Sequence, residues 1–160
     1  MELMRSIACE WSHRGLLLSA LFLLAFALPV FATLGEDVSS VQTDQAHMKA
    51  SVQVSRTANY TVHEMKAAEG TAVREFVSPS GKIFGVAWNG PFRPDLKQML
   101  GSYYDQFLAA AQSKRGGRNA PLNIQEPGLV VQMSGLQRSF VGRAYVPGML
   151  PQGVQPTEIK

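Results

Sequence analysis

The sequence has almost no cysteine: Cys9 is the single one among 160 residues. Small exported domains are often held by several disulfides, and this chain cannot form one within itself. Cys9 also precedes the first long apolar run, whereas the lipidated cysteine of a lipoprotein follows such a run. We therefore expect the folded part to depend on its hydrophobic core alone.

The sequence also has little excess of one sign of charge over the other. Fifteen Lys and Arg stand against twelve Asp and Glu, which gives a net charge of +3 without any basic run. A nucleic-acid-binding domain needs a clustered basic footprint, so we expect no nucleic-acid partner.

Catalytic motifs are also missing. His63-Glu64 lacks the second histidine of a zinc-protease motif, because Ala67 stands four residues after His63. Gly116-Gly117 follows a predicted helix, whereas a phosphate-binding glycine loop precedes one, and no serine lies in a nucleophile elbow. We expect a non-catalytic protein that uses no metal and no cofactor.

One long apolar run is present, from Gly15 to Val30, and Arg14 precedes it. Val30-Phe31-Ala32 has the small residues that signal peptidase accepts, and Pro29 ends the apolar helix just before them. The pattern predicts a signal peptide over residues 1–32, cut between Ala32 and Thr33. We expect a periplasmic or secreted protein.

An uncleaved anchor is the alternative, because residues 15–34 carry no charge over 20 residues and could just span a bilayer core. In that case the chain would be an envelope structural protein, and this leader would be its only membrane contact. Initiation at Met4 would make the leader more basic, and the sequence leaves this choice open.

Residues 33–57 are polar and aperiodic, which predicts a flexible tether before a single domain over 58–155. The domain opens with three β-rich runs, at residues 60–66, 71–78 and 82–89. Gly70 and Gly81 end the tight turns between these runs. We expect a three-stranded antiparallel meander.

The turns predict which residues share a face, with Ala67 opposite Thr71 and Ser78 opposite Lys82. The predicted core face collects Tyr60, Val62, Phe76, Phe84, Val86 and Trp88. The other face collects Thr61, His63, Met65, Val73, Glu75, Val77, Ile83, Gly85 and Ala87. Because this second face is also partly apolar, we expect the tether, the C-terminal tail or a partner to cover part of it.

The clearest element is an amphipathic helix from Asp95 to Lys114. Its apolar stripe consists of Leu96, Leu100, Tyr103, Tyr104, Phe107, Leu108 and Ala111. Two further strands are expected at residues 128–134 and 137–146, followed by a proline-rich extended segment and a tail over 156–160. The predicted fold is α+β, with about five antiparallel strands in the order β-β-β-α-β-β and the helix on one face.

Several short motifs resemble a family of exported Gram-negative bacterial proteins known only as a domain of unknown function. The matching residues are Val73-Arg74-Glu75-Phe76-Val77, Gly81, Phe84, Val86-Ala87-Trp88, Gly90-Pro91, Pro94-Asp95-Leu96, Leu100-Gly101, Tyr103, Pro127-Gly128-Leu129-Val130-Val131 and Gly142-Arg143-Ala144-Tyr145-Val146-Pro147. The Trp-x-Gly-Pro-x-x-Pro-Asp-Leu string is the most specific of them. The resemblance implies export and a single domain, and it implies no activity.

A ligand site is expected at the corner where the third strand meets the helix. Arg93, beside the helix N-terminus that Asp95 opens, could hold an anion while Trp88 or Phe92 stacks on it. The alternative is that both aromatic rings belong to the core and Arg93 pairs with an acid. Arg143 and Tyr145 are weaker candidates of the same kind.

Two cross-strand polar pairs follow from the predicted register. His63 lies opposite Glu75, where the carboxylate could raise the histidine pKa or share a metal with it, or where the two form an exposed ion pair. Glu64 lies opposite Arg74, and we expect a structural charged pair there.

The preferred hypothesis for function is an exported, non-catalytic interaction module, with an envelope protein or a second copy of the chain as its partner. One alternative is a small ligand-binding protein or hydrolase that uses the corner from Trp88 to Asp95, with Arg93 as anion clamp. The other alternative is the envelope structural protein with an uncleaved leader.

Overall fold

The computed structural model describes residues 34–38, 51–114 and 120–160. The predicted leader over 1–32, its cleavage residues Ala32 and Thr33, and His47 lie outside the described residues.

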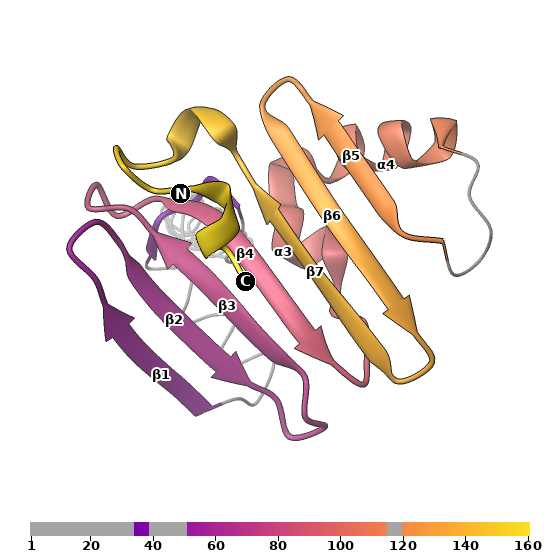
Figure 1. Ribbon diagram of the computed structural model, residues 1–160, viewed down its shortest axis with the longest axis horizontal. Helices are drawn as coiled ribbons and strands as arrows, with labels where there is room; N and C mark the ends of the chain where they lie inside the picture. Colours follow the sequence, from indigo (N-terminus) through magenta and orange to yellow (C-terminus); the bar gives the residue numbers. More distant parts are fainter. Residues whose placement is uncertain (1–33, 39–50, 115–119) are drawn as a thin grey trace, which may run out of the picture.

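The centre of the molecule is one antiparallel sheet of seven strands (Figure 1). The strands are Ser51–Arg56 (β1), Thr61–Lys66 (β2), Ala72–Val77 (β3), Ile83–Gly90 (β4), Leu122–Glu126 (β5), Leu129–Leu136 (β6) and Ser139–Tyr145 (β7). Their order across the sheet is β1-β2-β3-β4-β7-β6-β5, so the two halves of the chain join where β4 pairs with β7.

The sheet therefore has two strands more than the expected five or so, and both lie at its edges. β1 falls within residues 33–57, which the sequence predicted to be a flexible tether. This prediction is wrong for the described part of the segment, because it contains a strand and the fully buried Leu34. Most of β1 is exposed, so its residues carry little apolar alternation. β5 has only five residues and pairs with β6 across a tight turn at Pro127-Gly128, where Gly128 has φ of 86°.

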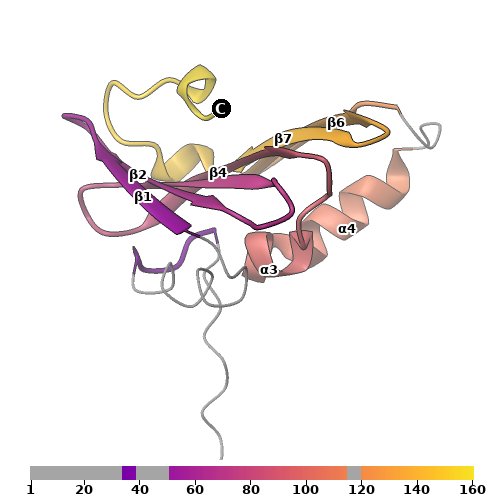
Figure 2. The same cartoon turned by 90° about the horizontal axis from the view of Figure 1, so that it is seen from below.

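One face of the sheet, here called the helix face, is covered by helical residues 96–113 (Figure 2). The predicted single helix is divided into Leu96–Leu100 (α3), a 3-10 turn at Gly101–Tyr103 (η2) and Tyr104–Ser113 (α4), because Gly101 has φ of 48°. The helix-face core includes Val73, Val77, Val86, Trp88, Leu100, Phe107, Val131 and Ala144. In the described part of the chain no helix is both long and apolar enough to cross a membrane.

The register between β2 and β3 agrees with the prediction, with Val62 opposite Phe76. The register between β3 and β4 starts as predicted, with Val77 opposite Ile83, and then shifts so that Phe76 lies opposite Gly85. This bulge corrects the predicted faces, because Phe84 and Trp88 belong to different cores on opposite sides of the sheet.

The opposite face, here called the tail face, is partly covered by the C-terminal segment, residues 146–160 (Figure 2). This segment was expected to be extended, but it contains 3-10 turns at Pro147–Met149 (η3) and Pro156–Glu158 (η4) and packs back on the sheet. The tail-face core consists of Phe76, Phe84, Ala87, Val154 and Ile159. The tail thus covers the face that carries Phe76 and Phe84, which was predicted as the core face. The predicted second face is the helix face, and the cover expected there includes Leu34 from residues 33–57, which packs in the helix-face core.

Candidate functional site

A row of polar side chains crosses the tail face. Successive strand pairings align Glu64, Arg74, Ala87, Arg143, Gln132 and Asn123 from β2 to β5. Ala87 is the only one without a polar side chain, so the two arginines stand on either side of a small residue. Because neighbouring strands are about 4.8 Å apart, the Cα atoms of these arginines lie about 10 Å apart.

Arg74 forms the charged pair with Glu64 that its sequence position predicts. Its Nε donates to Oε2 of Glu64 at 2.7 Å, and its Nη1 donates to the main-chain oxygen of Lys160 at 2.9 Å. Arg74 thus neutralises a carboxylate and holds the C-terminal tail at the same time.

Arg143 holds the same tail from the other side of Ala87. Its Nη1 donates to the carbonyl oxygens of Pro156 at 2.8 Å and Ile159 at 3.3 Å, and its Nε donates to Oε1 of Gln132 at 2.8 Å. All three acceptors are uncharged, and the described residues offer Arg143 no carboxylate. The guanidinium charge is therefore hydrogen-bonded but not neutralised.

A groove of about 710 Å³ begins at this row, beside the end of the tail. Polar and basic side chains from β3, β4, β6, β7 and the segment around β5 line it: Arg74, Asn89, Asn123, Gln132, Ser134 and Arg143. Val141, which is half exposed, supplies part of its apolar surface. Among the described residues, the groove lining includes three basic residues, the third being Lys160, and no Asp or Glu.

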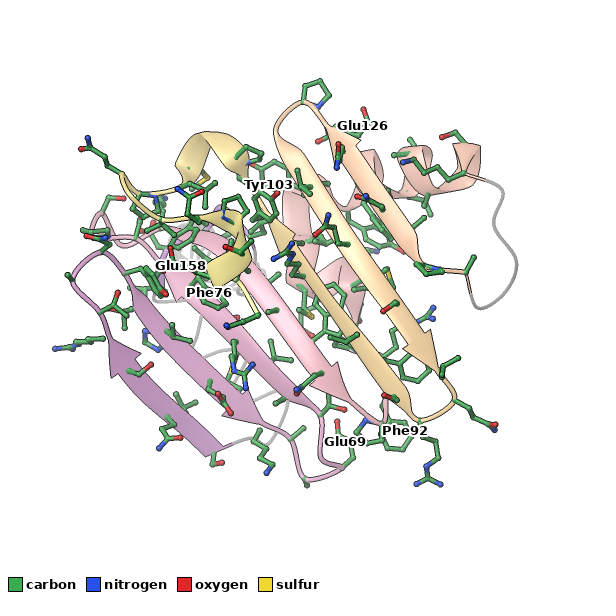
Figure 3. All side chains as sticks on the ribbon, viewed as in Figure 1. Glu69, Phe76, Phe92, Tyr103, Glu126 and Glu158 are labelled. Carbon is green, nitrogen blue, oxygen red and sulfur yellow. The ribbon has the colours of Figure 1, made fainter. Side chains whose placement is uncertain are left out.

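The tail covers only one part of the tail face, and the groove lies beside the part that it covers. Figure 3 shows Glu158 of the tail over the strand that carries Phe76, whereas Phe92 lies at the far end of the sheet.

The hydroxyl of Tyr60 donates to Oε2 of Glu158 at 3.1 Å. Burial of the hydroxyl, together with the bond to this carboxylate, raises the pKa of Tyr60.

His63 and Glu75 are cross-strand partners, as predicted, but not on an exposed face. Glu75 is only 3% exposed. The pKa of His63 is lowered, first by burial and second by the charge of Arg56, which is opposite to the predicted rise. No group of three metal-ligating side chains occurs in the described residues, so no metal site can be built around this pair from them.

The residues of the predicted corner site do not form one binding site, because each of them makes different contacts. Trp88 is 3% exposed within the helix-face core, so its ring offers little surface for stacking. Oδ1 of Asp95 accepts bonds from the main-chain N–H groups of Lys97 and Gln98 and thereby fills the helix N-terminus.

The two remaining corner residues stay accessible. Phe92 is half exposed rather than buried, and the guanidinium of Arg93 lies 5.0 Å from the ring centroid of Phe140. A hollow of about 480 Å³ borders Phe140 and Arg138 beside them, and it shares Asn89 and Val141 with the groove.

Most of the groove was missed from the sequence. Arg143 was named as a weak candidate and does line the groove, whereas Tyr145 packs against the tail-face core. Gln132 and Asn123 were not singled out, although both alternate with apolar neighbours along their strands. That alternation places them on one face, but only the strand order places that face beside Arg143.

Comparison with known proteins gives one family. No curated protein and no solved structure matches the chain. A family model described as "Protein of unknown function (DUF2844)" matches residues 30–159.

Proposed function

Because the chain belongs to this family, whose function is unknown, we propose from its geometry that it is an exported, non-catalytic binding module. The groove on the tail face is its binding site. The single observation that carries this proposal is an open space of about 710 Å³ beside the tail, within the size range of small-ligand sites.

The chemistry of the lining favours binding over catalysis. Ser134 supplies a hydroxyl group, but no His, Asp, Glu or Cys stands among the residues that line the groove to act as its base. The amides of Asn89, Asn123 and Gln132 can donate and accept hydrogen bonds, which suits recognition of a ligand.

Export is supported by the apolar leader and by the extent of the family match. The match begins at residue 30, close to the predicted cut between Ala32 and Thr33. Intact mass of the exported protein tests this part, since Thr33 is the expected first residue. A mass that retains the leader would favour the anchored alternative.

A thermal-shift screen of small carboxylates, alcohols, sugars and amines tests the binding site. A ligand present at about one hundred times its Kd stabilises the native state by about 2.7 kcal/mol, which raises Tm measurably. We expect at least one compound whose effect is lost in Ser134→Glu, which changes a residue of the groove that does not border the smaller hollow, and retained in Arg93→Ala, at the corner.

The opposite result assigns the site to the second candidate. The contact of Arg93 with Phe140, beside the smaller hollow, is the observation that favours the corner. A ligand whose binding Arg93→Ala abolishes and Ser134→Glu leaves unchanged would place binding there. A screen without any stabilising compound would contradict both sites.

A further inference from the structure

We infer, on the basis of the proposed function, that the ligand of the groove is an amphiphilic carboxylate: a single apolar chain that ends in one carboxylate group. Three properties of the groove lead to this class of ligand: its charge, its apolar surface, and the way in which the C-terminal tail already occupies the neighbouring part of the same face.

The charge of the groove favours an anion. Two guanidinium groups line it, those of Arg143 and Arg74, and Arg74 is the one of the two that is paired with a side-chain carboxylate, Glu64, which is not part of the lining. The hydrogen bonds of Arg143 to the described part of the chain use its Nε and Nη1 groups, so its Nη2 group can donate to a ligand. A carboxylate matches a guanidinium in both charge and geometry.

The apolar surface of the groove favours a chain rather than a compact ion. Val141 is 50% exposed and lies on the tail face between Asn89 and Ser134, one on each neighbouring strand. The aromatic residue of the lining, Trp88, is 3% exposed, so the groove offers no open ring on which a sugar could stack.

The tail shows the same recognition within the protein itself. The fully buried side chain of Ile159 packs over Gly85, where an added Cβ would come within 2.9 Å of its Cδ1. On either side, Arg74 and Arg143 donate to main-chain oxygens of the tail. This face thus holds an aliphatic body whose oxygen acceptors meet the two arginines, and a carboxylate with an alkyl chain repeats that chemistry in the open part.

Calorimetric titration of the full folded chain with decanoate tests the inference, with decanol and acetate as matched probes. Decanol keeps the apolar chain without the charge, and acetate keeps the charge without the chain. We expect decanoate to bind with a Kd of about 1 mM or lower, and each of the other probes to bind at least about tenfold more weakly.

Substitutions place the site. Val141→Glu should weaken decanoate binding at least about tenfold, because it adds a like charge inside the groove, while Val141→Lys should bind decanoate at least about tenfold more tightly than Val141→Glu. The control is Val54→Glu on β1, where the valine is similarly exposed, at 48%, and lies at the far edge of the sheet. This control should bind decanoate like the unsubstituted chain.

Each other outcome overturns the inference in a distinct way. Equal binding of decanol and decanoate, lost in Val141→Glu, would refute the anionic ligand and leave the groove as the binding site. Equal loss in Val141→Glu and Val54→Glu would refute the location. No binding of decanoate, decanol or acetate would refute the ligand class, and the wider thermal-shift screen would then decide whether the proposed function also fails.

Discussion

Gly142 on β7 lies directly opposite Trp88 on β4, and the indole ring packs across it. A Cβ at this position would overlap Cζ2 of Trp88. We predict that Gly142→Ala lowers the free energy of unfolding by about 1–3 kcal/mol, since overpacking forces the ring or the strand to move. Urea unfolding measures this change.

Gly148 provides the matched control, because a Cβ there meets no atom within 4 Å. Gly148→Ala should change the free energy of unfolding by less than about 0.5 kcal/mol. Equal effects of the two substitutions would show that the indole does not lie against Gly142.

His63 makes the stability depend on pH. Its native pKa lies below the ordinary value of 6.5, so on acidification the unfolded chain takes up a proton before the native chain does. The free energy of unfolding should therefore fall as pH decreases from above 6.5 toward the native pKa. His63→Gln should show a shallower fall between about pH 7.5 and about pH 5.5 in urea titrations.

Arg56→Gln is the second variant in this series, because Arg56 is the charged neighbour that lowers the pKa of His63. Removing its charge should also make the pH dependence shallower, though less than His63→Gln does, since burial is the larger cause. An unchanged slope in His63→Gln would contradict the lowered pKa.

At the scale of residues, the sequence predicted the register between β2 and β3 correctly, but it missed the shift in register between β3 and β4. The turn before β3 could be predicted, because Gly70 has φ of 92° and Ala67 pairs with Thr71 as expected. The bulge after Ile83 could not be predicted. Residues 83–88 are all apolar or glycine and all buried, so alternation between faces carries no information there.

At the scale of elements, the C-terminal tail behaves as a second covering layer rather than as an appendage. Ile159→Ala should lower the free energy of unfolding by about 2–5 kcal/mol, because the side chain is fully buried on the tail face. Thr157→Ala, at an exposed position two residues earlier, should change it by less than about 0.5 kcal/mol. A neutral Ile159→Ala would mean that the tail does not dock.

The elements that the sequence predicted are those with a strong local signal. The helix over residues 96–113 has a continuous apolar stripe, and Asp95 caps it as expected. The prolines of the tail correctly predicted that it would form no strand, but packing against β3 and β4 depends on long-range contacts. β1 escaped prediction because an exposed edge strand needs few apolar residues.

At the scale of the whole molecule, one sheet separates two unequal layers. The helix layer covers one face, and the short tail covers part of the other (Figure 2). The groove beside Arg143 lies on the part of that face next to the tail. The sequence predicted the helix layer, and it named the tail among three possible covers for a second face, but the tail covers the face predicted as the core face. The groove itself depends on the pairing of β4 with β7, which joins distant parts of the chain and has no local signal.

The position of the binding site within this architecture is the central claim, and backbone amide shifts in ¹H–¹⁵N spectra during a decanoate titration test it most directly. The largest shifts are expected at Asn89, Gln132, Ser134 and Val141, which line the groove on three neighbouring strands. Shifts confined to residues 92–95 at the corner, or to α4 on the helix face, would contradict it.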